Sequence, residues 1–114
     1  MKLDMVIKKS ILNTSCLLEE ILHNLGKFSK QDLAYSAHVY IAKGLAELAI
    51  QAALDFIIYT IGFSGGVAYN EIITKEISNI VKKAGFTFVN NTKVPPGDGG
   101  VSFGQAIIAG KLRE

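Results

Sequence analysis

The chain has 114 residues, of which 49% are hydrophobic and 19% are charged, and its formal net charge is +2. This length favours a single domain, residues 1–114, with its own core, and so small a charge argues against nucleic-acid partners or an anionic membrane surface. The longest apolar stretches fall short of the roughly 20 residues that a bilayer-spanning helix needs, and nothing at the N-terminus resembles a signal peptide, so we expect a cytoplasmic protein.

The first predicted element is an amphipathic helix. Apolar residues recur at spacings of three and four over residues 5–25, and Gly26 is expected to end the helix. Cys16, the single cysteine, lies in this stretch and fits a reducing compartment. We expect it to be a small buried hydrophobe, because no histidine lies nearby in sequence to activate it.

A second long helix is predicted from Ser29 to about Leu54. Asp32 follows Ser29 by three residues, as in a capping box with aspartate in place of the usual glutamate. His38 lies near the apolar stripe of this helix, where it is either a hydrogen-bonded boundary residue or, less commonly, a ligand or base. Four small residues are expected to allow close helix packing: Ala42, Gly44, Ala46 and Ala49.

The C-terminal half alternates strands with helices. An apolar run over residues 56–62 predicts a buried strand, and residues 70–83 predict a helix that Gly85 stops. Residues 86–90 predict a second strand, and a last helix is expected from near Gly99. The side chains of that helix predicted to point inward are Val101, Phe103, Ala106, Ile107 and Ile108.

The first candidate binding loop is Ser64-Gly65-Gly66, with Asn70 at the start of the next helix. Without Cβ atoms the glycines allow the backbone to approach a ligand, and a helix that follows directly directs free N–H groups at an anion. Two plainer explanations stand beside this one. The glycines form a tight turn without a ligand, and Asn70 is only a helix N-cap.

The second candidate loop spans residues 94–105 and places Asp98 between Pro95-Pro96 and a Gly-Gly pair. A carboxylate at a helix start is placed to meet a metal ion or a nucleotide. Asp98 is equally suited to be the N-cap of the last helix.

Together these loops resemble the C-terminal part of the HypF family, the carbamoyltransferases of [NiFe] hydrogenase maturation. That family carries Ser-Gly-Gly-Val-x-x-Asn, then Ala-Gly-Phe, then Val-Pro-Pro-x-Asp-Gly-Gly-x-x-x-Gly-Gln. The chain has the same motifs in the same order: Ser64 to Asn70, Ala84-Gly85-Phe86, and Val94 to Gln105. The threonylcarbamoyl transferase family TsaD is similar, but its matching loop reads more like Thr-Asp-Asn-Gly.

The resemblance implies an α/β fold, namely part of an actin-like ATPase (ASKHA, TsaD-like) lobe in which two long N-terminal helices precede strand-helix-strand-helix. It covers only the C-terminal lobe of the family's two-lobed transferase domain. The paired histidines that bind metal in the family are missing, because the only histidines here are His23 and His38. We therefore expect a lobe that lacks its partner lobe and carries no catalytic residue of its own.

By this resemblance the chain is expected to share in carbamoyl transfer from carbamoyl-adenylate to the C-terminal cysteine of HypE. Ser64, Gly65, Gly66 and Asn70 would bind the nucleotide, ATP or carbamoyl-adenylate. Asp98 would be one ligand of a divalent metal, Fe or Zn. Two readings remain open: a piece of a carbamoyltransferase that is inactive alone, and a stand-alone remnant that acts as a binding module and forms a homodimer.

Overall fold

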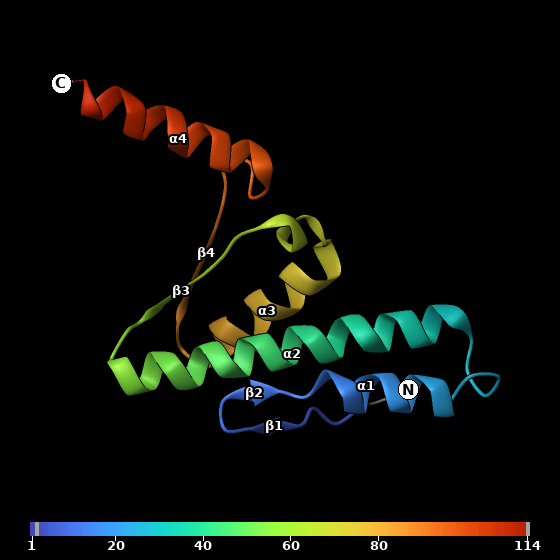
Figure 1. The fold of residues 1–114 in the computed structure, drawn as a ribbon. Coiled ribbons are helices and arrows are strands. Elements are labelled where there is room, and N and C mark those ends of the chain that lie inside the picture. Colours follow the sequence, from blue (N-terminus) through green and yellow to red (C-terminus); the bar gives the residue numbers. More distant parts are fainter. Residues whose placement is uncertain (2, 114) are drawn as a thin grey trace.

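The fold is mixed α/β, as expected. The computed structural model describes residue 1 and residues 3–113. In chain order the elements are β1 (Ile7–Lys8), β2 (Ile11–Leu12), α1 (Thr14–His23), α2 (Lys30–Phe56), β3 (Thr60–Phe63), the 3-10 helix η1 (Gly66–Tyr69), α3 (Glu71–Lys83), β4 (Thr87–Asn90) and α4 (Asp98–Leu112). Helices α2 and α3 pack beside a small parallel sheet, α1 lies along α2, and α4 extends away from them (Figure 1). None of the described helices is both long and apolar enough to cross a membrane.

The hydrophobic core lies where α2 and α3 pack together beside β3. Ala42 and Ala46 of α2 are fully buried, which confirms that small residues allow close packing on this helix. Gly44 is also buried, and a Cβ at this position would collide with the side chain of Leu12. The buried core residues of α3 and the sheet are Ile61, Ile73, Ile77 and Val81.

The N-terminal helix is shorter than predicted, because residues 7–12 form a β-hairpin. Ile7 pairs with Leu12 and Lys8 with Ile11 in antiparallel register. Lys9 and Ser10, the two turn residues, have φ of 52° and 61°, the sign that a type I′ turn requires at both positions. The spacing of the apolar residues in this stretch fits a helix as well as a hairpin, and Lys-Ser is not a typical turn pair, so the sequence did not reveal the hairpin.

Helix α2 begins as predicted and ends later than predicted. The Ser29 hydroxyl oxygen accepts a hydrogen bond of 3.1 Å from the Asp32 backbone N–H, which confirms the N-cap. The helix continues to Phe56 and ends at Ile57 in a left-handed conformation, with φ of 56°. The prediction of a buried strand from residue 56 is therefore wrong. The strand starts at Thr60, and the apolar residues of the corner from Phe56 to Tyr59 are exposed.

The two central strands are parallel, with Thr60 paired to Thr87 and Phe63 paired to Asn90. Helix α3 connects the two strands, as predicted from the sequence, and packs its buried face into the core. It ends at Lys83, and Gly85 follows with φ of 91°, which confirms the predicted glycine stop.

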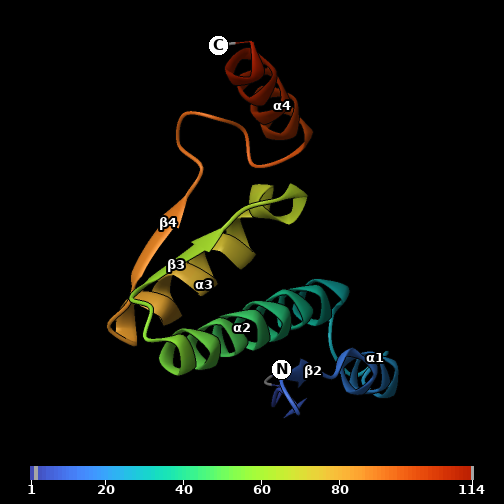
Figure 2. The ribbon, with the colours of Figure 1, turned by 60° about the vertical axis from the view of Figure 1, so that its left-hand side comes forward.

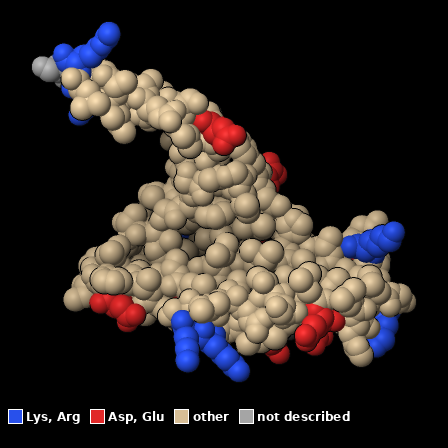
Figure 3. Space-filling model, viewed as in Figure 1, with Lys and Arg blue, Asp and Glu red and all other residues tan. Residues whose placement is uncertain are grey.

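Helix α4 begins at Asp98, close to the predicted start, but its predicted packing is wrong. It extends away from the α2–α3 body (Figure 2) and has no buried residue among those described. Val101, Phe103, Ala106, Ile107 and Ile108 are all exposed. In Figure 3 its charged side chains lie only at the two ends of the helix, with an uncharged surface between them. The helix carries apolar side chains along most of its length, but none of the described residues packs over them.

Candidate functional site

The two glycine-containing loops predicted from sequence lie against each other. The backbone N–H of Gly65 donates a 2.8 Å hydrogen bond to the carbonyl oxygen of Pro96. The Ser64 hydroxyl lies 3.5 Å from the same oxygen. Both loops follow the carboxyl ends of the parallel strands β3 and β4, and this common position is why they meet.

Gly65 and Gly66 have different conformations and different surroundings. Gly65 has φ of 107° and ψ of 177°, a region that is essentially restricted to glycine. Gly66 is not among the residues with positive φ, and a Cβ built on it meets no atom within 4 Å. Backbone geometry therefore accounts for Gly65, while nothing among the described residues requires a glycine at position 66.

The helix expected directly after the glycines is interrupted. Residues Gly66–Tyr69 form a four-residue 3-10 helix, and α3 begins only at Glu71. The first turn of α3 is already capped, because the Asn70 side-chain oxygen accepts a 3.1 Å bond from the Ile73 N–H. The glycine loop therefore does not lead directly into the N-terminus of a long helix. The N-cap role of Asn70 is confirmed.

In the second loop, close contacts explain the glycines around Asp98. A Cβ on Gly97 would lie 2.8 Å from the ring of Tyr69, so this glycine lets the first loop pack against the second. A Cβ on Gly100 would collide with the carbonyl oxygen of Pro95, and one on Gly99 would lie 3.2 Å from the Pro95 ring. Pro95 thus packs closely against the first turn of α4, and this packing requires the two glycines.

Asp98 is the first residue of α4 and is exposed. The N-cap is Gly97, and no side chain caps the helix, so the interpretation of Asp98 as the N-cap is wrong. Its backbone oxygen accepts a 3.3 Å bond from the Ser102 hydroxyl. No hydrogen bond joins the Asp98 carboxylate to the part of the chain that the structure describes.

The described residues do not form a metal site by themselves. Over residue 1 and residues 3–113, no three His, Cys, Asp or Glu side chains gather closely enough to hold an ion. The two histidines lie on other elements, His23 in the last turn of α1 and His38 on α2. His38 is half-buried, with Nδ1 2.7 Å from the Ala34 carbonyl oxygen, which fits a boundary residue. Asp98 is the single acidic residue of the two loops.

Tyr69 and Pro96 connect the two loops, and neither was predicted from the sequence as a site residue. Pro96 contributes a backbone carbonyl, which any residue has, and Tyr69 contributes a ring face against a glycine. The only available signal was a large aromatic residue in a glycine loop, and this is too common to be informative.

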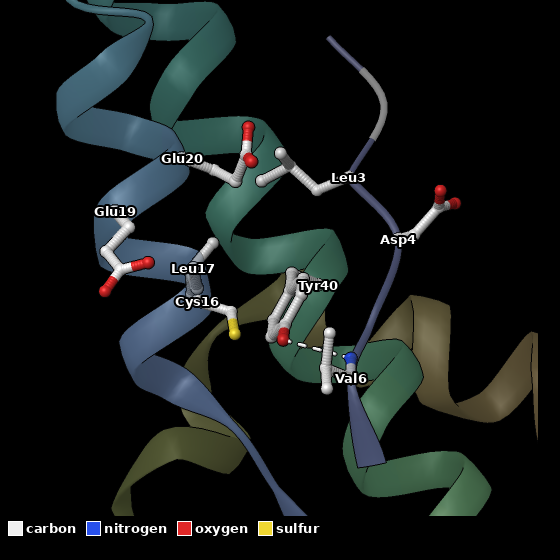
Figure 4. Close-up of a pocket in the computed structure, with 8 residues that line it drawn as sticks. All are labelled: Leu3, Asp4, Val6, Cys16, Leu17, Glu19, Glu20 and Tyr40. Carbon is white, nitrogen blue, oxygen red and sulfur yellow. Dashed lines mark hydrogen bonds between the residues drawn. The ribbon is translucent and has the colours of Figure 1, made fainter.

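A cavity of about 310 Å³ lies apart from these loops, between α1, α2 and the segment before the N-terminal hairpin that carries Leu3, Asp4 and Val6 (Figure 4). Cys16 lines it and is half-buried, so the prediction of a buried small residue holds only in part. Tyr40 of α2 also lines the cavity. Its hydroxyl accepts a 3.2 Å bond from the Val6 N–H and donates one of 2.6 Å to the Asn13 carbonyl oxygen.

Residues 1–105 match the protein-family model described as "Carbamoyltransferase, Kae1-like Domain, second subdomain". The chain is 48% identical over 105 residues to the probable carbamoyltransferase HypF of Methanocaldococcus jannaschii, an alignment that covers 89% of this chain and 13% of that protein. It is 39% identical over 57 residues to the tRNA N6-adenosine threonylcarbamoyltransferase of Trichodesmium erythraeum, which covers 50% of this chain and 18% of that protein.

Two solved structures are similar to this fold. The crystal structure of T. kodakarensis HypF superposes with a TM-score of 0.85 at 37% identity, covering 96% of this chain and 14% of that one. A full-length HypF in its phosphate- and nucleotide-bound form gives a TM-score of 0.84 at 26% identity, and the match covers 99% of this chain and 16% of that one. The chain thus spans about one seventh of these proteins.

Proposed function

The chain belongs to the HypF carbamoyltransferase family, and on this premise we propose that it forms one lobe of a carbamoyl transfer site. Its two joined loops would bind the nucleotide part of carbamoyl-adenylate. The carbamoyl group would pass to the C-terminal cysteine of a HypE-like partner. The second-subdomain match and the small share of the HypF proteins that it spans support the view that the chain acts with another lobe.

One observation carries the proposed nucleotide contact: neither backbone conformation nor close packing among the described residues requires a glycine at position 66. Gly65 needs its positive φ and Gly97 needs room for Tyr69, but the Cβ position of Gly66 faces open space. A nucleotide phosphate or ribose lying against the backbone at that point explains the missing side chain. Ser64 and Asn70 flank this position and would add a hydroxyl and an amide to the contact.

Asp98 remains a proposed metal ligand. Its carboxylate is exposed and makes no hydrogen bond with the described residues, so it is available to an ion. One carboxylate does not hold Fe or Zn tightly, and the remaining ligands would have to come from the other lobe. When bound there, a divalent metal would polarise the carbamoyl donor.

The residues of this chain would act by positioning the bound nucleotide for the reaction. The Gly65–Pro96 hydrogen bond fixes the distance between the loops before a ligand arrives, so less ordering is needed on binding. We expect the chain alone to transfer no carbamoyl group, because the metal-binding histidine pair of the family and the other lobe would have to be supplied from outside it.

A chimera tests this proposal. This chain replaces the matching segment of the M. jannaschii protein, and carbamoyl transfer is measured with its HypE acceptor. Transfer should be retained with the wild-type chain and lost with Gly66→Val. Equal transfer by both chimeras would overturn the nucleotide assignment. Transfer by the isolated chain above a no-protein background would overturn the half-site proposal.

A second candidate is a homodimeric binding module without catalysis. The observation that favours it is α4, whose side chains between Asp98 and Lys111 are uncharged and mostly apolar, and which buries none of its described residues. A soluble helix of this composition is normally buried against another surface. A second copy of the chain is one such surface, and a two-fold pair is the commonest arrangement.

A further inference from the structure

A groove of about 430 Å³ runs along the seam between α3 and β4. The α3 side presents Glu71, Thr74, Lys75, Ser78 and Lys82, and the β4 side presents Phe88 and Asn90. These helical residues share one face, because they recur at spacings of three and four along α3. The groove therefore has one wall made by a strand and one made by a polar helix face.

The strand wall of this groove is an open sheet edge. The Thr87 N–H donates a 2.9 Å bond to Tyr59, on the β3 side of β4. Backbone groups alternate along a strand, so those of Phe88 and Asn90 point away from β3. Within the described residues the sheet has only β3 and β4, and no further strand pairs with β4. The outer N–H and C=O groups are thus available to another chain segment.

The helix wall of the groove has an excess of one positive charge. Lys75 and Lys82 are exposed on α3 and line the groove, against the single acidic side chain of Glu71 at one end. Ser78 lies between the lysines and adds a hydroxyl. An extended segment beside β4 would place every second side chain toward this wall, where acidic residues are favoured by charge.

We propose that this groove binds an extended acidic peptide segment of a partner protein, which adds a strand to the free edge of β4. Backbone hydrogen bonds to Phe88 and Asn90 would give the pairing, and Lys75 and Lys82 would select acidic side chains. Grooves between an edge strand and a helix bind peptides in this way in other proteins. The inference does not depend on the nucleotide contact at Gly66.

The test uses the whole chain and a defined probe. The probe is the acetylated, amidated peptide Thr-Glu-Thr-Glu-Thr-Glu-Thr, and its control carries lysine in place of each glutamate. Binding is followed by amide chemical shifts and by amide hydrogen exchange. The acidic peptide should shift the amides of Phe88 and Asn90 saturably and slow their exchange. The lysine peptide should do neither.

Charge-reversal variants separate the groove from general electrostatics. Lys75→Glu and Lys82→Glu should each weaken acidic-peptide binding by about fivefold or more. The matched control is Lys83→Glu, which changes an exposed lysine on the same helix that does not line the groove and should bind like wild type. Asn90→Pro removes an N–H that faces outward and should weaken binding while leaving the β3–β4 ladder intact.

Three results would overturn the proposal. The first is the absence of saturable binding to the wild-type chain up to about 1 mM peptide. The second is an equal loss of affinity in Lys83→Glu and in the two groove variants. The third is competition by inorganic polyphosphate that reproduces the same shifts, since this would show that the groove binds anions without adding a strand.

Discussion

The backbone N–H of Gly65 and the carbonyl oxygen of Pro96 are joined by a 2.8 Å hydrogen bond, although α3 and β4 separate the two residues in sequence. This bond turns two separate sequence motifs into one site. Because it is a backbone contact, a substitution at Gly65 would affect it by changing the backbone conformation. A side chain added at Gly66 would instead fill the open space beside the loop.

Gly65→Ala and Gly66→Ala should therefore behave differently. Gly65→Ala forces a Cβ into a backbone region with φ of 107° and should lower the free energy of unfolding by about 1–3 kcal/mol. Gly66→Ala has neither strain nor a close neighbour and should melt like wild type. Thermal melts of the two variants side by side check this. Equal destabilisation would show that Gly66 also has a structural role.

Asp98→Asn should abolish carbamoyl transfer in the chimera while changing its melting little, if the carboxylate is a metal ligand. In the isolated chain Asp98→Ala should cost only about 0.3–1 kcal/mol, because Asp98 is not the cap and acts only through its charge near the helix start. Transfer assays and chemical denaturation give the two readouts. An Asp98→Asn chimera with normal transfer contradicts the metal assignment.

Asn70→Ala should lower the stability of the chain by about 1 kcal/mol, because α3 loses the bond from the Ile73 N–H to its cap. Asn70→Asp keeps the cap and serves as the matched control. If Asn70 also contacts the nucleotide, Asn70→Asp should melt normally yet bind ATP more weakly, since it adds a negative charge beside the phosphates. Urea denaturation and ATP titration distinguish the two roles.

Tyr40→Phe should loosen the N-terminal hairpin. The Tyr40 hydroxyl bonds both Val6 and Asn13 from a side chain that is only 2% exposed, so its removal leaves backbone groups without partners. We expect a loss of about 1–3 kcal/mol and faster hydrogen exchange at the Val6 amide. Tyr35→Phe, at an exposed position on the same helix, is the control and should be silent.

Association through α4 is expected for the isolated chain. Light scattering at high micromolar concentration should show a dimer, and Phe103→Glu with Ile107→Glu should convert it to a monomer that still folds, because both side chains are exposed in the single chain. A wild-type chain that stays strictly monomeric argues against the dimer.

The parts of the fold that depend on local chemistry were predictable. Ser29 and Asn70 cap their helices as their residue types indicate, because a cap needs only its own side chain and the next turn. Glycine at position 85 ended α3 for an equally local reason. The order of strand, helix, strand and helix followed from these boundaries.

The errors arose where a local pattern has more than one outcome. Over residues 7–12 the apolar spacing suits a helix or a hairpin, and the contact of Leu12 with Gly44 together with the Tyr40 bonds favours the hairpin. Over residues 56–59 an apolar run suggests burial, yet α2 continues to Phe56 and the corner is exposed. Neither outcome can be read from neighbouring residues.

For the candidate site, the components could be predicted from the sequence: the residue types of both loops, and their positions after two strands. The folded chain was needed to show that the loops are bonded through Gly65 and Pro96, that Gly97 and not Asp98 caps α4, and that α4 lies exposed. A side-chain cap such as Ser29 or Asn70 depends on a few adjacent residues, whereas Gly97 packs against Tyr69 of the other loop. Contacts between loops and the burial of a helix depend on surfaces that distant parts of the chain, or other chains, must supply.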